Sequence, residues 1–450
     1  MSVNLRVFIG ITTRVALAIA TTPALAFAQD RGGVAPRVAV DRERGQSVDE
    51  FVALALRQSP DGLAARARGE AARGELAQAA LRPNPSLSFE RRDEIGGMDA
   101  QTSIGLAWPL DLFRRDGRVA VARTSVEAAD AASADRDRNI AFETRRRVAR
   151  LLSALKMLQL REDLAASNRK TVELITARAE AGAAPIIDRD VATIEAARSE
   201  ADVRRQRAEV SQIASELRAL AGLGPDAPLV FRDTLEEMAA ATDRIVPPDE
   251  LAADRVQEAV SRRPDVRQAD AEEARAKARQ DLARREGRAD VSLFASYMRM
   301  NSGFPQFGLT SSGANEPIAG TFNNVAAGVM VMLPWRNRNQ GAIAAAAAEE
   351  AAARHERNAR RLDALNEIDA LRRQEEAARD AVAVFSAGAR ALAARNVEVQ
   401  RESYQLGRAT LLDVLAETRR YLDFETAYAA TLLELVEARV ALAAALGGGR

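Results

Sequence analysis

Cysteine is absent from this chain of 450 residues, and histidine occurs once, at His355. The lack of cysteine excludes thiol catalysis, disulfides, cysteine-ligated zinc and a lipid anchor on an N-terminal cysteine. A single histidine excludes a multi-histidine metal site within one chain. Because His355 stands in a segment rich in arginine and glutamate, we expect a solvent-exposed side chain there rather than a metal ligand.

The chain also has no net charge and few aromatic side chains. The 64 basic side chains balance 64 acidic ones, so the chain as a whole has no electrostatic footprint for nucleic acid. Aromatic residues make up 4%, although 47% of the residues are hydrophobic, and much of the apolar share is alanine. This composition favours long helices packed side by side over a thick globular core.

Catalytic motifs are missing as well. The sequence has no G-x-S-x-G motif, no evident nucleophile–base pair and no cluster of metal ligands. The segment Gly222-Leu223-Gly224-Pro225 is not a phosphate-binding loop, because it follows a predicted helix and lacks the required lysine. We therefore predict that the protein is not an enzyme and has no catalytic residue, cofactor or bound metal.

A secretory signal peptide is predicted over residues 1–28. Arg6 and Arg14 supply its positive start, and Ala26-Phe27-Ala28 gives the small-x-small cleavage pattern. A membrane anchor is the alternative, but Pro23 interrupts the apolar stretch, which is shorter than ~20 residues. No later segment has the length and apolar character of a spanning helix. We expect an exported protein without a helical membrane anchor.

Two parts of the chain repeat one plan. Ser59-Pro60-Asp61 recurs as Arg263-Pro264-Asp265 at an offset of 204 positions, and Trp108-Pro109 recurs as Leu333-Pro334 at an offset of 225. The second offset also maps Gly182 onto Gly407, Asp188 onto Asp413 and Leu217 onto Leu442. The offset grows by 21, which indicates an insertion over Asn301–Thr321. That stretch is rich in Gly, Ser, Asn and Pro, so we predict a longer loop.

The duplication divides the chain into five predicted parts. They are a signal peptide (1–28), an N-terminal segment (29–58), a first repeat (59–222), a crossover linker (223–250) and a second repeat (251–447). In the first repeat we predict a helix over 61–81, strands over 86–95 and 102–110, a long helix over 119–180 and a helix over 187–220. In the second we predict a helix ending at Arg285, strands near 291–299 and 322–333, a long helix ending near Leu406 and a last helix ending at Leu446.

The helix lengths indicate an elongated molecule. A helix of about 62 residues reaches roughly 90 Å, far beyond an ordinary globular helix. The two shorter helices of the repeat together nearly match that length, so they fit end to end and antiparallel beside the long one. This arrangement places the strand pair at one extreme and the break at Gly182 at the other.

The strands leave two interpretations open. Strands of about nine or ten residues are long enough to cross a bilayer when tilted, and Leu87 and Phe89 alternate with small or polar residues. Four strands cannot close a barrel alone, whereas three chains would supply twelve. A soluble β-layer that caps a helical bundle would show the same alternation.

The chain resembles the outer-membrane efflux (TolC-like) family over nearly all of its predicted mature length. The resemblance is carried by Pro83-Asn84-Pro85-Ser86-Leu87-Ser88-Phe89, by Gly182-x-x-Pro185-x-x-Asp188, by Tyr404-x-x-Gly407-x-x-Thr410-Leu411-Leu412-Asp413, and by the similar endings at 217–222 and 442–447. It implies a mainly α fold of tandem-duplicated helical hairpins that form a periplasmic α-barrel. It also implies four strands per chain in a trimeric 12-strand outer-membrane β-barrel.

The family resemblance also implies a function and partners. Such proteins are passive exit ducts of tripartite pumps and work as homotrimers in outer-membrane lipid, with a periplasmic adaptor and an inner-membrane pump. The start Asn84-Pro85-x-Leu87-Ser88-Phe89-Glu90 and the short first hairpin are most similar to the CzcC-like heavy-metal branch. That similarity implies export of cobalt, zinc, cadmium or nickel cations with a pump of the resistance-nodulation-division type. A duct for drug efflux or protein secretion, and a soluble periplasmic coiled-coil scaffold, are the alternatives.

The tips of the helical hairpins are the predicted functional site. Residues predicted to contact the adaptor are Gly182, Tyr404, Leu406, Gly407, Arg408 and Leu411, and ordinary coiled-coil packing is the competing interpretation. Asp188 and Asp413, repeated threefold, are candidate pore-mouth carboxylates that would favour cations. Helix capping is an alternative role for Asp413, because Thr410-x-x-Asp413 has the spacing of an N-terminal cap.

Overall fold

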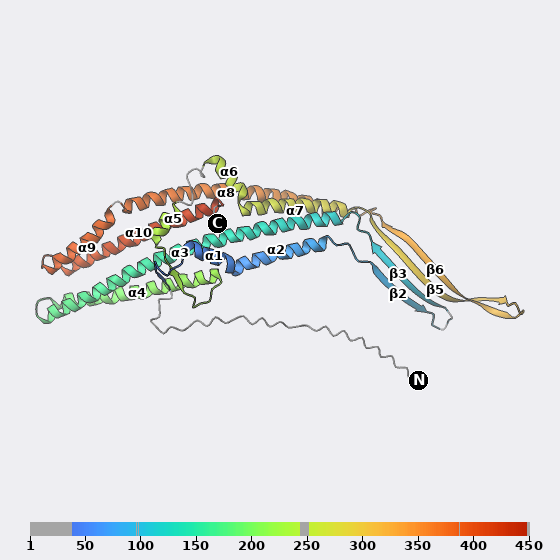
Figure 1. Ribbon diagram of the computed structural model, residues 1–450, viewed down its shortest axis with the longest axis horizontal. Helices are drawn as coiled ribbons and strands as arrows, with labels where there is room; N and C mark the ends of the chain where they lie inside the picture. Colours follow the sequence, from blue (N-terminus) through green and yellow to red (C-terminus); the bar gives the residue numbers. More distant parts are fainter. Residues whose placement is uncertain (1–37, 96, 98, 244–251, 387, 448–450) are drawn as a thin grey trace, which may run out of the picture.

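The computed structural model describes residues 38–95, 97, 99–243, 252–386 and 388–447. The predicted signal peptide and the end of the crossover linker therefore lie outside the described residues. Figure 1 shows an elongated molecule with the strands at one end, the turns between long helices at the other, and short elements beside the middle of the bundle.

Each repeat contains two strands that lead into a long helical hairpin. The first comprises α2 (Pro60–Ala79), β2 (Ser86–Asp93), β3 (Ala100–Pro109), α3 (Arg115–Glu180) and α4 (Ile186–Ala221). The second comprises α7 (Pro264–Glu286), β5 (Asp290–Leu309), β6 (Asn315–Met332), α8 (Gln340–Ser386), α9 (Ala389–Gln405) and α10 (Leu411–Ala445). Helices α2 and α4 both pack against the 66-residue α3, which confirms the predicted end-to-end arrangement.

Two predictions for the second repeat were wrong. The long helix is broken, because α8 ends at Ser386 and α9 begins at Ala389, after Gly388 with a φ of +88°. The insertion over Asn301–Thr321 is not a loop but lengthens β5 and β6, whose residues pair from Asn301 with Thr321 to Leu309 with Asn315. Its polar composition suggested a loop, yet a two-stranded ribbon satisfies the backbone hydrogen bonds of such a segment without a core.

The largest cluster of buried apolar side chains among the described residues lies at the middle of the bundle. Short elements there are β1 (Val38–Val40), α1 (Val48–Gln58), β4 (Leu229–Phe231), α5 (Leu235–Thr242) and α6 (Ala253–Arg262), and β1 pairs parallel with β4. Phe51 and Phe231 are fully buried, with ring centroids 5.4 Å apart in an edge-to-face arrangement. Helix α1 was not predicted, although Ser47 and Glu50 form a capping box at its start.

The four longer strands form one antiparallel sheet in the order β2-β3-β5-β6. Its register brings alternate apolar side chains onto one face, for example Leu106 opposite Leu87 and Val329 opposite Leu293. We call this the apolar sheet face; its exposed members are Leu87, Phe89, Ile104, Leu106, Trp108, Leu293, Tyr297, Val325, Val329 and Val331. Each of these side chains is at least 40% exposed, so the described chain leaves the face uncovered.

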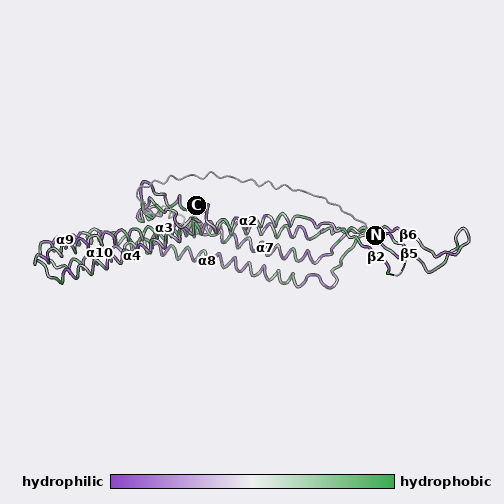
Figure 2. Tube along the Cα trace, turned by 90° about the horizontal axis from the view of Figure 1, so that it is seen from below, coloured by the Kyte–Doolittle hydropathy of each residue, from purple (hydrophilic) through white to green (hydrophobic). Residues whose placement is uncertain are grey.

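Hydrophilic residues are interspersed along the long helices (Figure 2). Within the part of the chain that the structure describes, no helix combines the length and the apolar character needed to cross a membrane.

Candidate functional site at the helical turns

The α3–α4 turn is built on a glycine. Gly182 has a φ of +71°, a left-handed conformation that glycine adopts without steric cost. The amide of Ala183 donates to the carbonyl of Arg178 at 2.7 Å, and the amide of Gly182 donates to Ala179 at 3.0 Å. These are the bonds of a Schellman cap, which ends α3 and reverses the chain. Helix α4 then begins after Pro185, with no side-chain cap.

The α9–α10 turn repeats this geometry and adds a capping box. Gly407 has a φ of +72°, and the amide of Arg408 donates to the carbonyl of Ser403 at 2.8 Å. The amide of Asp413 donates to the Thr410 hydroxyl at 3.2 Å, and the Thr410 amide donates to the Asp413 carboxylate at 2.9 Å. Hydrogen bonds from the Thr410 hydroxyl and amide hold the pKa of the Asp413 carboxyl below its ordinary value.

A small core holds the two turns together. Ile175, Ala192 and Leu411 are buried in it, and Tyr404 packs against it. The Arg178 guanidinium lies 6.0 Å from the centre of the Tyr404 ring, within the range of a cation–π contact. Residues of both hairpins therefore meet near the turns, through contacts between segments far apart in sequence.

The structure separates the predicted adaptor-contact residues into two groups. Leu406, Gly407 and Arg408 are exposed on the α9–α10 turn, and Gly182 is exposed on the other turn. Leu411 is 3% exposed and Tyr404 is half-buried, so these two lie in the packing between the hairpins. Sequence reasoning missed the exposed aliphatic side chains next to the turns, which are Ile186, Ile187, Ile194 and Leu412, each at least 64% exposed. The Ile-Ile pair directly after Pro185 was the available signal.

The two candidate carboxylates are not equivalent. Asp413 is engaged in the capping box, so its capping role is observed directly. Asp188 is the third residue of α4 and its backbone amide donates to the carbonyl of Pro185 at 3.1 Å. Both lie in the first turn of a helix, where a carboxylate interacts favourably with the helix dipole. Among the described residues, no group of three or more potential His, Cys, Asp or Glu metal ligands comes together.

A charged cluster around Tyr428 connects the two hairpins to α5. The Arg390 Nε donates to the buried Glu425 carboxylate at 2.6 Å, directly after the break at Gly388. Arg390 and Lys156 lie 4.9 and 4.8 Å from the centre of the Tyr428 ring. Lys156 also pairs with Glu236. Burial acts to raise the pKa of the Glu236 carboxyl, but Lys156, a backbone hydrogen bond and Arg390 together outweigh burial, and the net shift is downward.

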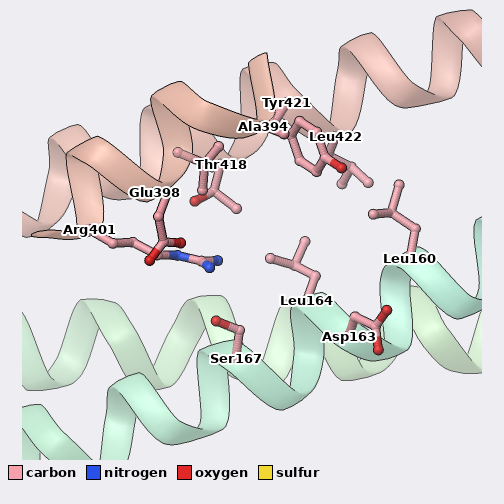
Figure 3. A pocket seen from close by; sticks show the side chains of 11 residues that line it. Leu160, Asp163, Leu164, Ser167, Ala394, Glu398, Arg401, Thr418, Tyr421 and Leu422 are labelled. Carbon is pink, nitrogen blue, oxygen red and sulfur yellow. The ribbon is translucent and has the colours of Figure 1, made fainter. Parts of the chain in front are cut away.

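A cavity of about 300 Å³ lies between the hairpins, on the side of the turns. Figure 3 shows that α3 contributes Leu160 and Leu164 to its lining, opposite Thr418 and Leu422 of α10, with Arg401 of α9 at one side. Its lining is mixed in polarity, as expected where two hairpins approach without a continuous apolar seam.

Solved structures of outer-membrane proteins and channels share this fold. The chain is 16% identical to CusC, with a TM-score of 0.68 and coverage of 90% of this chain and 92% of that one. It is 21% identical to VceC from Vibrio cholerae (TM-score 0.67; 89% and 96%) and 18% identical to the open state of the Neisseria gonorrhoeae MtrE channel (TM-score 0.65; 94% and 94%). At these identities the similarity shows the fold alone.

The chain belongs to the family described as outer membrane efflux protein, whose sequence model matches residues 51–223 and 256–448. No curated protein sequence matches it. The family and the fold confirm the mainly α architecture of long helical hairpins with a small strand part that the residues at 83–89 and 404–413 led us to expect.

Proposed function

We propose that three copies of this chain form the outer-membrane exit duct of a tripartite efflux pump. The observation that carries the proposal is the four-stranded sheet at one end of the molecule. Its apolar face is exposed, and its edge strands β2 and β6 have no strand beyond them among the described residues. Open edges are not tolerated in lipid, so each β6 would pair with the β2 of a neighbour until twelve strands close a barrel.

The helices would continue this barrel as a tunnel into the periplasm. The α3–α4 and α9–α10 turns lie at the far end from the strands (Figure 1). Exposed aliphatic side chains at the turns, such as Ile187 and Leu406, offer apolar contact area to an adaptor protein. Energy and primary selectivity would come from an inner-membrane pump, because the sequence carries no nucleotide-binding motif.

Heavy-metal cations are the proposed cargo. The CzcC-like segment at 84–90 supports this assignment. Asp188 and Asp413 support it as well, because six carboxylates near the mouth of a trimer would favour cations over anions. A duct of this kind should release its cargo, so strong chelating sites are not required of it.

Membrane fractionation and cross-linking test the duct. Because the chain has no cysteine, a pair of introduced cysteines is unique. We expect Ser88→Cys in β2, combined in turn with single cysteines along β6, to give disulfide-linked trimers in the outer-membrane fraction. Pairs within α3 serve as the control and should give no intermolecular links. Recovery of the protein in the soluble periplasm would instead favour the coiled-coil scaffold.

Growth of a deletion strain tests the cargo. We expect sensitivity to graded zinc, cadmium, cobalt or nickel, with unchanged tolerance of dyes and antibiotics. Sensitivity confined to organic compounds would retain the duct and discard metal as its cargo.

A further inference from the structure

A cavity of about 630 Å³ lies where the strands meet the helices. Residues from three connections line it: Arg114 after β3, Glu286 to Asp290 between α7 and β5, and Met332 to Asn339 between β6 and α8. We call it the junction cavity. The turns that hold the candidate adaptor site lie at the opposite end of the molecule (Figure 1).

The four strand–helix connections at this end of the molecule are strongly basic, and the three that line the cavity contribute three arginines, Glu286 and Asp290 to its lining. Residues 81–85, 110–118, 284–290 and 333–339 contain nine arginines, four acidic residues and no lysine, a net charge of +5 in a chain whose total charge is zero. Arginine suits phosphate, because its planar guanidinium donates two parallel hydrogen bonds to an oxyanion.

Salt bridges neutralise only some of these arginines. Arg114 pairs with Asp290 at 3.2 Å, and Arg118 pairs with Asp111 at 2.7 Å. Arg288 is exposed and lies 5.7 Å from the centre of the Phe113 ring. Arg336 is exposed too, and neither it nor Arg288 makes a salt bridge within the described part of the chain. Two cavity-lining guanidinium groups are therefore available to an anion.

The other wall of the junction cavity is apolar. Leu333 is 69% exposed and Trp335 is 82% exposed. Leu333 follows Val331 at the two-residue period of a strand, so it continues the apolar sheet face toward the helices. An occupant with an anionic group beside a hydrocarbon chain would match both walls at once.

We propose that the junction cavity binds an anionic phospholipid. Its phosphate would lie between Arg288 and Arg336, and an acyl chain would follow Leu333 and Trp335 onto the apolar sheet face. The proposal rests on the proposed insertion of the sheet into a membrane, and it adds a lipid preference that the insertion alone does not require. Charge complementarity selects an anionic over a zwitterionic headgroup, because the three lining arginines outnumber the lining carboxylates of Glu286 and Asp290.

Native mass spectrometry of the purified trimer in detergent tests this, with dioleoylphosphatidylglycerol and dioleoylphosphatidylcholine as the two probes. We expect the wild type to bind phosphatidylglycerol more tightly. The Arg288→Gln/Arg336→Gln variant should lose that preference, at roughly fivefold per arginine. The matched control is Arg354→Gln, an exposed arginine on α8 about 21 Å from the start of that helix. It should behave as the wild type does.

Trp335→Ala tests the apolar wall separately from the basic wall. We expect it to weaken the binding of both lipids by a similar factor. Equal binding of the two lipids by the wild type, or an unchanged preference in the double variant, would overturn the proposal. So would full displacement of phosphatidylglycerol by inorganic phosphate at equal concentration, since the cavity would then be a free-phosphate site.

Conductance measurements in planar bilayers distinguish a failure of the lipid-site proposal from a failure of the proposed duct. A wild type that conducts but shows no lipid preference leaves the duct intact and removes only the lipid site. A wild type that neither inserts nor conducts removes the duct itself.

Discussion

The α3–α4 and α9–α10 turns occupy equivalent positions in the two repeats, yet the following helix begins differently in each. Both turns reverse at a left-handed glycine, Gly182 or Gly407, with the same pattern of backbone hydrogen bonds. Helix α10 begins with the Thr410 capping box, whereas α4 begins after Pro185 without a side-chain cap. The comparison shows that reversal depends on the glycine, while the cap is an addition made in one copy only.

The helices that lead into these turns differ as well. Helix α3 runs unbroken for 66 residues, whereas its counterpart is divided at Gly388 into α8 and α9. The second hairpin has the Arg390–Glu425 pair directly after its break, and the capping box at its turn. Side-chain contacts thus stabilise the second hairpin where backbone continuity stabilises the first.

The largest expected effect is the loss of a buried leucine near the end of each repeat, and it tests whether the two copies are equally stabilised there. Leu217 and Leu442 are equivalent by the repeat and are 0% and 2% exposed. We expect Leu217→Ala and Leu442→Ala each to lower the free energy of unfolding by about 2–5 kcal/mol, because each leaves a cavity in a packed core. Urea unfolding followed by circular dichroism measures this. The exposed Leu412→Ala is the control, and a large loss there would contradict the distinction.

The Arg390–Glu425 pair gives the next effect. Glu425 is 3% exposed and Arg390 is 43% exposed, so Glu425→Gln removes a half-buried charge pair, with an expected cost of about 1–2 kcal/mol. A spin label on Leu406→Cys should become more mobile, while one on Ile186→Cys should not.

The equivalent carboxylate in the first repeat is the matched control. Glu200 pairs with Arg169 at 4.0 Å on an exposed surface, so Glu200→Gln should cost less than ~0.5 kcal/mol. Equal mobility changes in the two hairpins would mean that the Tyr428 cluster does not specifically support the second one.

The difference between the two turns is tested by removing the cap of α10 and by introducing a cap before α4. Thr410→Ala should destabilise the start of α10 by about 1 kcal/mol, because it removes the acceptor for the Asp413 amide. Pro185→Thr recreates the Thr-x-x-Asp spacing ahead of Asp188, and we expect it to slow amide hydrogen exchange in the first turn of α4. Unchanged exchange in Pro185→Thr would show that the α3–α4 turn cannot accommodate a capping box.

Lowering the pH is expected to have the smallest effect on the turns. The pKa of the Asp413 carboxyl is lowered in the folded state, so its stabilisation is fully present above the ordinary pKa of an aspartate, about 4, and is lost as the pH falls through the folded value. We expect the start of α10 to loosen below about pH 4, detected as increased mobility of a spin label on Leu412→Cys. The same label in Thr410→Ala should show a weaker pH dependence.

The sequence predicted what depends on local chemistry. Gly182, Pro185 and Gly407 placed both turns, because glycine and proline restrict the backbone wherever they occur. The break at Gly388 was missed, since an isolated glycine in an alanine-rich helix usually costs only ~1 kcal/mol and is tolerated. The extension of β5 and β6 was missed because its strand pairing depends on a partner strand rather than on its own composition.

The candidate site was only partly predictable for a similar reason. The exposed positions at Leu406 and Arg408 followed from the turn. The burial of Leu411 depends on Ile175 and Ala192, which belong to the other hairpin, and no local pattern encodes that contact. The exposure of Ile186 likewise depends on the absence of a covering neighbour within the described chain.

The continuity of α3 has a mechanical consequence. A straight helix of 66 residues is about 99 Å long, so a tilt of about 1° at its sheet end displaces the α3–α4 turn by about 1.7 Å. A straight helix of this length acts as a lever, because it amplifies a small rotation at the sheet end into a larger displacement at the far end. The break at Gly388 interrupts the corresponding lever in the second repeat, so the same rotation would reach the two turns with different amplitudes.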